Sequence, residues 1–142
     1  MAEIKWSSFT NGGAMQAGDQ LVGLRSGDNY RFTTNPLVIW TSIAGTSQSA
    51  AVNTGYIVAN ASQTTITLPA TFSVGDIVSI AGLGAAGWIL QPNAGDSVQT
   101  PVGAASTSIT SSSAYDSITV VGVVANTTWI ILSSSTTGFT IV

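Results

Sequence analysis

Apolar residues alternate with Ser, Thr and other small residues along much of the chain, most clearly between Gly55 and Val98. Turn-forming residues such as Pro69 and Asn93 divide this stretch into runs of five or six residues. Alternation at a period of two over short runs is typical of β-strands with one buried face. The strands predicted here are Tyr56–Ala59, Thr64–Leu68, Asp76–Ala81 and Gly87–Gln91, with a short one at Val98–Thr100.

Strand-like runs also precede this stretch. Gln20–Arg25 and Tyr30–Thr34 enclose the turn-rich residues Ser26–Asn29, which predicts a hairpin or a kinked edge. After Pro36, the sequence PLVIWTS predicts a further strand, and Ile43–Ser47 follows it as a linker.

The end of the chain has the same character. The Ser- and Thr-rich residues 103–113 predict an exposed loop or a thin outer strand. Two β-branched strands at Asp116–Val124 and Thr128–Ser133, and a terminal strand at Gly138–Val142, close the chain. No segment combines a helical apolar period with helix caps, so we expect little helix.

These patterns predict an all-β fold of short antiparallel strands that form a sandwich or a barrel. We expect residues 1–35 to form an N-terminal arm and hairpin, residues 36–54 a strand and linker, and residues 55–142 a β-structured module. In the arm, Ile4, Trp6 and Phe9 are bulky apolar residues in a segment too short to bury them. They are expected to dock on a partner or, alternatively, to pack on the chain's own domain.

Charge is scarce and unevenly placed. The 142 residues include only three Lys or Arg and six Asp or Glu, for a net charge of −3. All the basic residues lie within the first 31 positions, so a surface that follows nucleic-acid phosphates is not expected. A weakly charged β-rich surface aggregates unless its strand edges are paired or covered, which predicts self-association. From Phe32 onward the charged residues are Asp76, Asp96 and Asp116.

The chain lacks the residues that most enzymes use. It contains no Cys and no His, so thiolate chemistry and the usual general base at neutral pH are both excluded. A Ser nucleophile without His needs another base, and the only lysine, Lys5, belongs to the arm. Each Asp of the module stands alone at a turn, so turn capping is expected, although a trimer axis would gather three copies of one Asp into a possible cation site. We therefore expect no enzyme activity, no cofactor and no metal within one chain.

Gly82–Gly87 matches the G-x-G-x-x-G pattern of dinucleotide-binding proteins. That pattern works only where a helix starts at the glycines, because the helix N-terminus binds the pyrophosphate. Here the chain reaches Pro92 and a turn within a few residues, so we expect a glycine-rich turn or barrel corner instead.

Several bulky residues occupy alternating strand positions typical of a core. Four of them are aromatic and have sugar stacking as an alternative role, namely Trp40, Tyr56, Trp88 and Trp129. In the N-terminal region, Arg25 and Arg31 are expected to pair with Asp19 and Asp28 or to contact a partner. The residues predicted to form the module core or a trimer interface are Trp40, Tyr56, Leu68, Trp88, Trp129 and Ile131.

The module resembles a trimeric β-structured domain of tailed-bacteriophage virion proteins, which include tail fibres, head fibres and capsid decoration proteins. The upstream residues 18–33 resemble a short element that precedes such domains. The resemblance spans about 80 positions of the module. It rests on Gly55–Asn60, Thr65–Thr71, Val74–Val78, Gly82–Trp88, Gln91–Asp96 and Trp129–Ser134.

This resemblance implies a homotrimer and a structural role in the virion. The chain has no long shaft, which favours a capsid decoration (cement) protein over a fibre. Its arm would then bind the major capsid protein or another virion protein. The alternative is a tail or head fibre, or a receptor-binding tip that recognises host surface glycans. The arm residues expected to bind the partner are Ile4, Trp6, Phe9, Arg25 and Arg31.

Location follows from the same arguments. The N-terminal sequence MAEIKWSSF lacks the plan of a secretory signal, and no apolar run reaches the roughly 18 to 20 residues that cross a bilayer. We therefore expect a protein made in the host cytoplasm, incorporated in the virion and not associated with a membrane.

Overall fold

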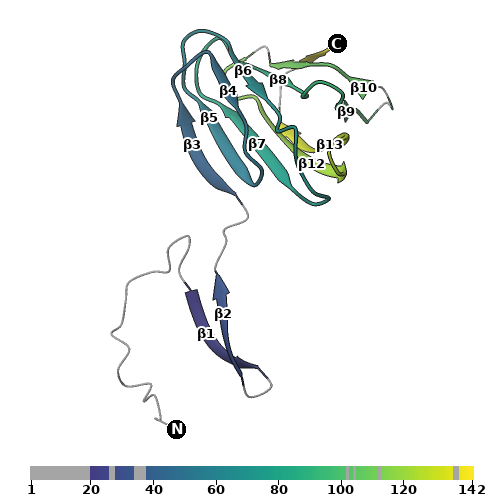
Figure 1. Ribbon diagram of the computed structural model, residues 1–142. Helices are drawn as coiled ribbons and strands as arrows, with labels where there is room; N and C mark the ends of the chain where they lie inside the picture. The colour runs from purple at the N-terminus through teal and green to yellow at the C-terminus, as the bar shows by residue number, and fades with distance from the viewer. Residues whose placement is uncertain are drawn as a thin grey trace. The chain divides into compact units, whose positions relative to one another are not determined.

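A computed structural model shows two compact units, Met1–Pro36 and Leu37–Val142. Each unit is described by itself below. The described part of the chain consists of strands, turns and loops without a helix (Figure 1). This confirms the all-β class. The residues described are 20–25, 28–33, 38–101, 103, 105–111, 113–135 and 138–142.

The first unit contains one antiparallel hairpin, as predicted. Strand β1 (Gln20–Arg25) pairs with β2 (Asp28–Thr33) in a register that sets Arg25 opposite Asp28 and Arg31 opposite Val22. Strand β2 begins two residues before the predicted Tyr30, because the pairing continues to the turn. The predicted arm residues Ile4, Trp6 and Phe9 lie outside the described residues, as does Asp19.

The second unit is built from two sheets. The larger sheet has seven strands in the order β10 (Ala105–Ser106), β9 (Ser97–Gln99), β13 (Thr128–Ser135), β12 (Ser117–Val124), β7 (Ile77–Gly82), β5 (Thr54–Val58) and β3 (Ile39–Ile43). The smaller sheet has five strands in the order β14 (Phe139–Ile141), β11 (Ile109–Ser111), β8 (Trp88–Gln91), β6 (Thr64–Thr67) and β4 (Ser47–Ser49).

Both sheets are mixed, so the prediction of antiparallel strands is correct for only part of each sheet. Strands β3, β5 and β7 run parallel to one another in the larger sheet, and β4, β6 and β8 do so in the smaller sheet. The cause is the path of the chain, because each connection from β3 to β8 crosses to the other sheet. Strands two apart in sequence therefore become neighbours and point the same way. Short connections predict hairpins, but in the described part of this unit only β9 with β10 and β12 with β13 are antiparallel neighbours that follow one another in sequence.

The segment expected to be a strand and a linker, residues 36–54, instead supplies one strand to each sheet. Strand β3 pairs with β5 along its whole length, and β4 pairs with β6. The side chain of Thr64 holds the connection in place by donating a hydrogen bond to the backbone oxygen of Gly45 at 2.8 Å. Pattern analysis missed β4 because its sequence, Ser-Gln-Ser, contains no apolar residue.

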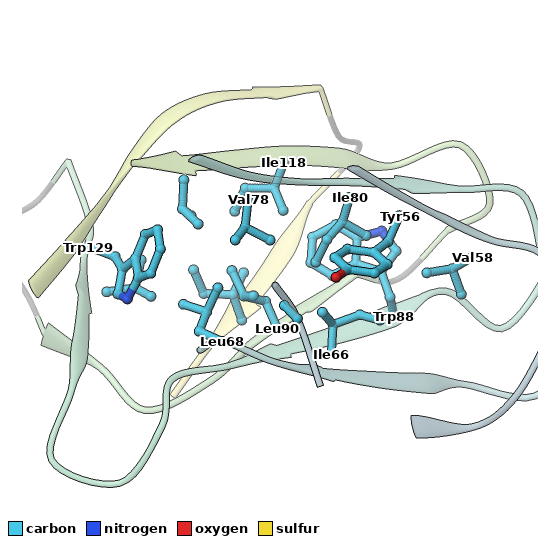
Figure 2. Close-up of a cluster of buried hydrophobic side chains, with 14 of the residues drawn as sticks. Tyr56, Val58, Ile66, Leu68, Val78, Ile80, Trp88, Leu90, Ile118 and Trp129 are labelled. Atoms are coloured by element: carbon cyan, nitrogen blue, oxygen red, sulfur yellow. The ribbon is translucent and has the colours of Figure 1, made fainter. Parts of the chain in front are cut away.

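Apolar side chains from the inner faces of both sheets form one core (Figure 2). Trp88 of the smaller sheet and Trp129 of the larger sheet are both fully buried. Each packs against a phenylalanine. The ring centroids of Trp129 and Phe72 are 4.1 Å apart, and those of Trp88 and Phe139 are 5.4 Å apart. The two sheets thus form a sandwich-like pair of layers.

Polar side chains at the turns complete the ladders at strand ends. Asn53, which has a φ of 56°, accepts a hydrogen bond from the backbone N–H of Ile77 at 3.1 Å and donates one to Asp76 at 2.9 Å. The other carboxylate oxygen of Asp76 accepts the N–H of Ser73 at 2.8 Å. Asp76 therefore has the turn-forming role that its position before a strand predicted.

One carbonyl links the sheets inside the core. The backbone oxygen of Asp116 accepts the indole N–H of Trp88 at 3.0 Å and the backbone N–H of Gly82 at 2.9 Å. Trp88 belongs to the smaller sheet and Gly82 to the larger one. Without this acceptor, the buried indole N–H would lack a partner at a cost of about 1–3 kcal/mol.

The loop after β7 touches the loop after β5, which makes one glycine irreplaceable. A Cβ on Gly84 would lie within van der Waals overlap of the backbone oxygen of Asn60. We predict that Gly84→Ala lowers the free energy of unfolding by at least about 2–3 kcal/mol, because backbone must move to relieve the overlap.

The matched control is Gly45→Ala, where a Cβ would meet only the backbone oxygen of Ser47 at 3.8 Å. This variant is expected to be neutral or slightly stabilising. Urea denaturation of both variants measures the difference, and equal midpoints would contradict the close approach of the two loops.

Candidate functional site

The outward-facing side of the larger sheet carries no charged side chain among the described residues. Along each strand, inner positions are buried in the core, and the alternate residues point away from it. We call these alternate residues the outer face. They are Trp40, Ser42, Gly55, Ile57, Ile77, Ser79, Ala81, Ser117, Thr119, Val121, Ile130 and Ser133.

One row across the outer face runs from β3 to β13. The indole of Trp40 lies on Gly55, since a Cβ added to that glycine would lie 2.5 Å from Cδ2 of the indole. Next in the row, the hydroxyls of Ser79 and Thr119 are 3.0 Å apart and share a hydrogen bond. These hydroxyls satisfy each other, which reduces their need for water. The outer face therefore combines apolar side chains with polar groups that are already paired.

The corresponding side of the smaller sheet is different. Its outward residues are mostly hydroxyl or amide side chains, and Ile89 is the apolar exception among the strands β6, β8 and β11. A hydroxyl-rich surface is well solvated, whereas the outer face exposes Trp40 and has several half-buried aliphatic residues. The larger sheet is therefore the better candidate for contact with another protein. The outward residues of the smaller sheet are Thr65, Thr67, Ile89, Gln91 and Thr110.

A second exposed apolar feature lies at the end of the sheets where β7 finishes and β12 starts. Leu83 and Tyr115 are 53% and 76% exposed, and the backbone bond from Gly82 to Asp116 brings their two loops together. Tyr115 has a φ of 70°, a conformation that costs a non-glycine residue free energy. Its turn is fixed because the Asp116 carboxylate accepts the N–H of Ser113 at 3.1 Å. The aromatic ring is thus exposed on a well-defined support.

The structure distributes the predicted core residues as follows. Tyr56, Leu68, Trp88 and Trp129 are buried in the core, and Ile131 packs against it from a partly buried position. Trp40 is not a core residue, because β3 is an edge strand and its indole, 51% exposed, points to the outer face. Of the four aromatic residues considered for sugar stacking, Trp40 alone is accessible.

Sequence patterns gave no indication of Leu83 and Tyr115. Both stand in loops rich in small residues, where alternation carries no information about exposure. The positive φ of Tyr115 has no signature in the sequence, since glycine or asparagine would be expected at such a position.

The glycine-rich segment behaves as expected. Gly82 ends β7, and the chain passes through a turn at residues 84–86 directly into strand β8. No helix starts there, so the segment has the glycine spacing of a dinucleotide-binding loop but not its structure.

Two further kinds of feature are absent from the described residues. No group of three acidic, His or Cys side chains is placed to hold a metal ion. No helix has the length and apolar character of a membrane span.

Comparison with protein-family models and with curated proteins gave no match. The functional assignment therefore rests on the surfaces described above and on the residues that carry the resemblance.

The strained turn at Tyr115 provides a stability test. Tyr115→Gly removes an exposed ring and relieves the left-handed conformation, so we predict a rise of about 1 kcal/mol in the free energy of unfolding.

The control is Ala114→Gly, the preceding residue of the same turn, which lies outside the positive-φ set and should lose stability instead. The denaturation midpoints of the two variants are compared with that of the wild type. A Tyr115→Gly variant less stable than wild type would show that the ring contributes more than the strain costs.

Proposed function

We propose that this chain is a bacteriophage structural protein, a capsid decoration (cement) protein that assembles as a homotrimer in the virion. The observation that carries the proposal is the outer face, a broad sheet surface with the exposed Trp40, several half-buried aliphatic side chains and no charge. Such a surface is typical of a protein that functions in contact with other proteins. No catalytic role is proposed.

The acidic residues of the second unit support this assignment by their positions. Asp116 is 2% exposed, and Asp76 is engaged in a turn with Asn53. Asp96 also lies in a turn, where its N–H donates to the backbone oxygen of Asn93 at 3.0 Å. None of them interrupts the outer face, so copies can approach through this face without repulsion between like charges.

The segments that carry the resemblance to phage virion domains all fall within this same unit. They coincide with β5, β6, the entry to β7, the loop before β8, the loop after β8 and strand β13. The resemblance therefore concerns the two-sheet unit as a whole and not one isolated turn.

In the proposed assembly, the trimer is held together by the outer faces. The N-terminal residues Ile4, Trp6, Phe9, Arg25 and Arg31 bind the major capsid protein or another virion protein. Three arms on one trimer would reinforce one another, because binding of the first raises the effective concentration of the others.

A second candidate function is a fibre or receptor-binding tip that recognises host surface glycans. The observation in its favour is the exposure of Tyr115 and Trp40, since aromatic rings stack on the apolar faces of sugars. Copy number distinguishes the two candidates. A decoration protein is present in proportion to the capsid protein, whereas a receptor tip is present in few copies and binds host cells.

Self-association is tested with a charge placed on the outer face. Ser133 is exposed in the single chain and lies in the row that includes Thr119. We predict that the wild type sediments as a trimer or a multiple of a trimer and that Ser133→Arg loses this three-fold assembly without loss of the circular dichroism spectrum, because three buried guanidinium groups would need to lose their hydration.

Ser62→Arg is the control, since Ser62 is exposed in the loop between β5 and β6, away from the outer face. It should remain trimeric. A wild-type protein that stays monomeric at micromolar concentration would contradict the proposal.

Attachment to particles is tested separately. We predict that Trp6→Ala combined with Phe9→Ala abolishes binding to decoration-free capsids while the trimer persists, because the apolar anchors of the arm are lost.

Ser7→Ala combined with Ser8→Ala changes the same segment without removing an anchor and should bind like the wild type. Co-sedimentation with capsids measures both variants. Full binding by the Trp6 and Phe9 variant would mean that the arm does not make the contact.

A further inference from the structure

Strand β3 ends the larger sheet and presents an unpaired edge among the described residues. The N–H of Ile39 donates to Asn53 at 3.2 Å, and the oxygen of Ile43 accepts from Ala59 at 2.9 Å. In a parallel ladder the bonding residues alternate along the strand. The N–H and C=O groups of Trp40 and Ser42 therefore point away from β5 and toward the open edge.

This edge has none of the features that keep strands from pairing. Strand β3 contains no charged residue, no proline and no bulge in its register with β5. Ile39 and Trp40 on it are 49% and 51% exposed. The other edge strands are shorter, since β10 has two residues and β4 and β14 have three each, and β4 has only polar side chains. Strand β3 is thus the edge best suited to receive another strand.

We propose that β3 pairs antiparallel with β3 of a second copy of this chain, centred on Thr41. With this register, Trp40 lies opposite Ser42 of the second copy, and the two residues exchange both backbone hydrogen bonds. The two-fold axis repeats the exchange on the other side. Thr41 lies opposite its own equivalent in a non-hydrogen-bonded pair, because its amide groups are already engaged with β5.

The side chains of β3 suit this self-pairing. A two-fold axis doubles any charge at an interface, and β3 carries none, so like charges never face each other. On the outer face, the large indole of Trp40 would lie beside the small Ser42 of the second copy. On the inner side, the half-exposed Ile39 would be covered by Ile43 of the second copy.

This contact is two-fold and uses the strand edge, whereas the proposed trimer is three-fold and uses the outer face. The inference therefore does not rest on the proposed function. Where both contacts exist, β3 joins one trimer to the next.

The test introduces a single thiol at the proposed axis. The chain has no cysteine, so Thr41→Cys creates the only one. In a non-hydrogen-bonded antiparallel pair the two Cα atoms are about 4.5 Å apart, within the range that a disulfide spans. We expect mild oxidation to convert most of the chain to a disulfide-linked dimer on a non-reducing gel. Thr41 is exposed in the single chain, so the substitution preserves the fold.

Ser62→Cys, in an exposed loop, measures cross-linking by random collision. The proposal is overturned if Thr41→Cys forms no more dimer than this control. It is also overturned if the Thr41→Cys protein stays uncross-linked alone but forms a disulfide-independent complex with another virion protein through β3.

A proline variant shows whether the edge itself makes the contact. In Thr41→Cys combined with Ser42→Pro, the proline removes an N–H that points outward and leaves the ladder to β5 intact. Cross-linking should fall to the level of the Ser62→Cys control while the thermal unfolding midpoint is kept. Cross-linking that persists would overturn the pairing.

Sedimentation of Ser42→Pro alone separates this inference from the proposed function. A trimer supports the outer-face contact, whereas a monomer would overturn the three-fold assembly. In either case the cross-linking of Thr41→Cys decides whether the two-fold contact exists.

Discussion

The structure of the second unit depends on burying apolar side chains between two sheets with a chain that repeatedly changes sheet. Each crossing between β3 and β8 delivers one strand to the larger sheet and the next to the smaller one. Because a strand is too short to be stable alone, every crossing must bring its alternate residues to the same central layer. The buried residues Tyr56, Ile66, Ile80 and Leu90 come from four successive strands and meet there (Figure 2).

Hydrogen bonds take the place of ion pairs in this unit, and most of them join uncharged groups. From Phe32 onward the sequence has no Lys or Arg, so side-chain salt bridges are impossible within it. Asn side chains form some of these hydrogen bonds at loops. The amide oxygen of Asn126, for example, accepts the backbone N–H of Phe72 at 2.7 Å. Asp116 contributes through its backbone oxygen as well as its carboxylate. Contacts between uncharged groups depend little on salt.

The sequence was sufficient to locate most strands and the central part of the core. The alternation in β6, β12 and β13 was strong enough to give starts within one residue of the observed ones, and Trp88 and Trp129 were correctly expected to pack. Strand direction was not predictable, because a short connection between two strands looks the same whether it stays within a sheet or crosses to the other. Strand β4 was missed because pairing, and not its own polar side chains, makes it a strand.

The same limit applies to the candidate site. Trp40 occupies an alternating position like those of the buried tryptophans, yet its exposure is decided by the place of β3 at the end of the strand order. Edge position is a property of the whole sheet, so no local pattern contains it. The conformation of Tyr115 likewise depends on the surrounding turn.

The position of β7 between β5 and β12 has a consequence for how the chain folds during synthesis. One side of β7 pairs with β5, which leaves the ribosome before it, but the other side pairs with β12, which is made only after β8 to β11. The nascent chain must therefore hold an incomplete sheet in which one edge of β7 is still unpaired. Because such long-range pairing is slow, this interval is when the growing chain is most vulnerable to misassociation with its neighbours on a polysome.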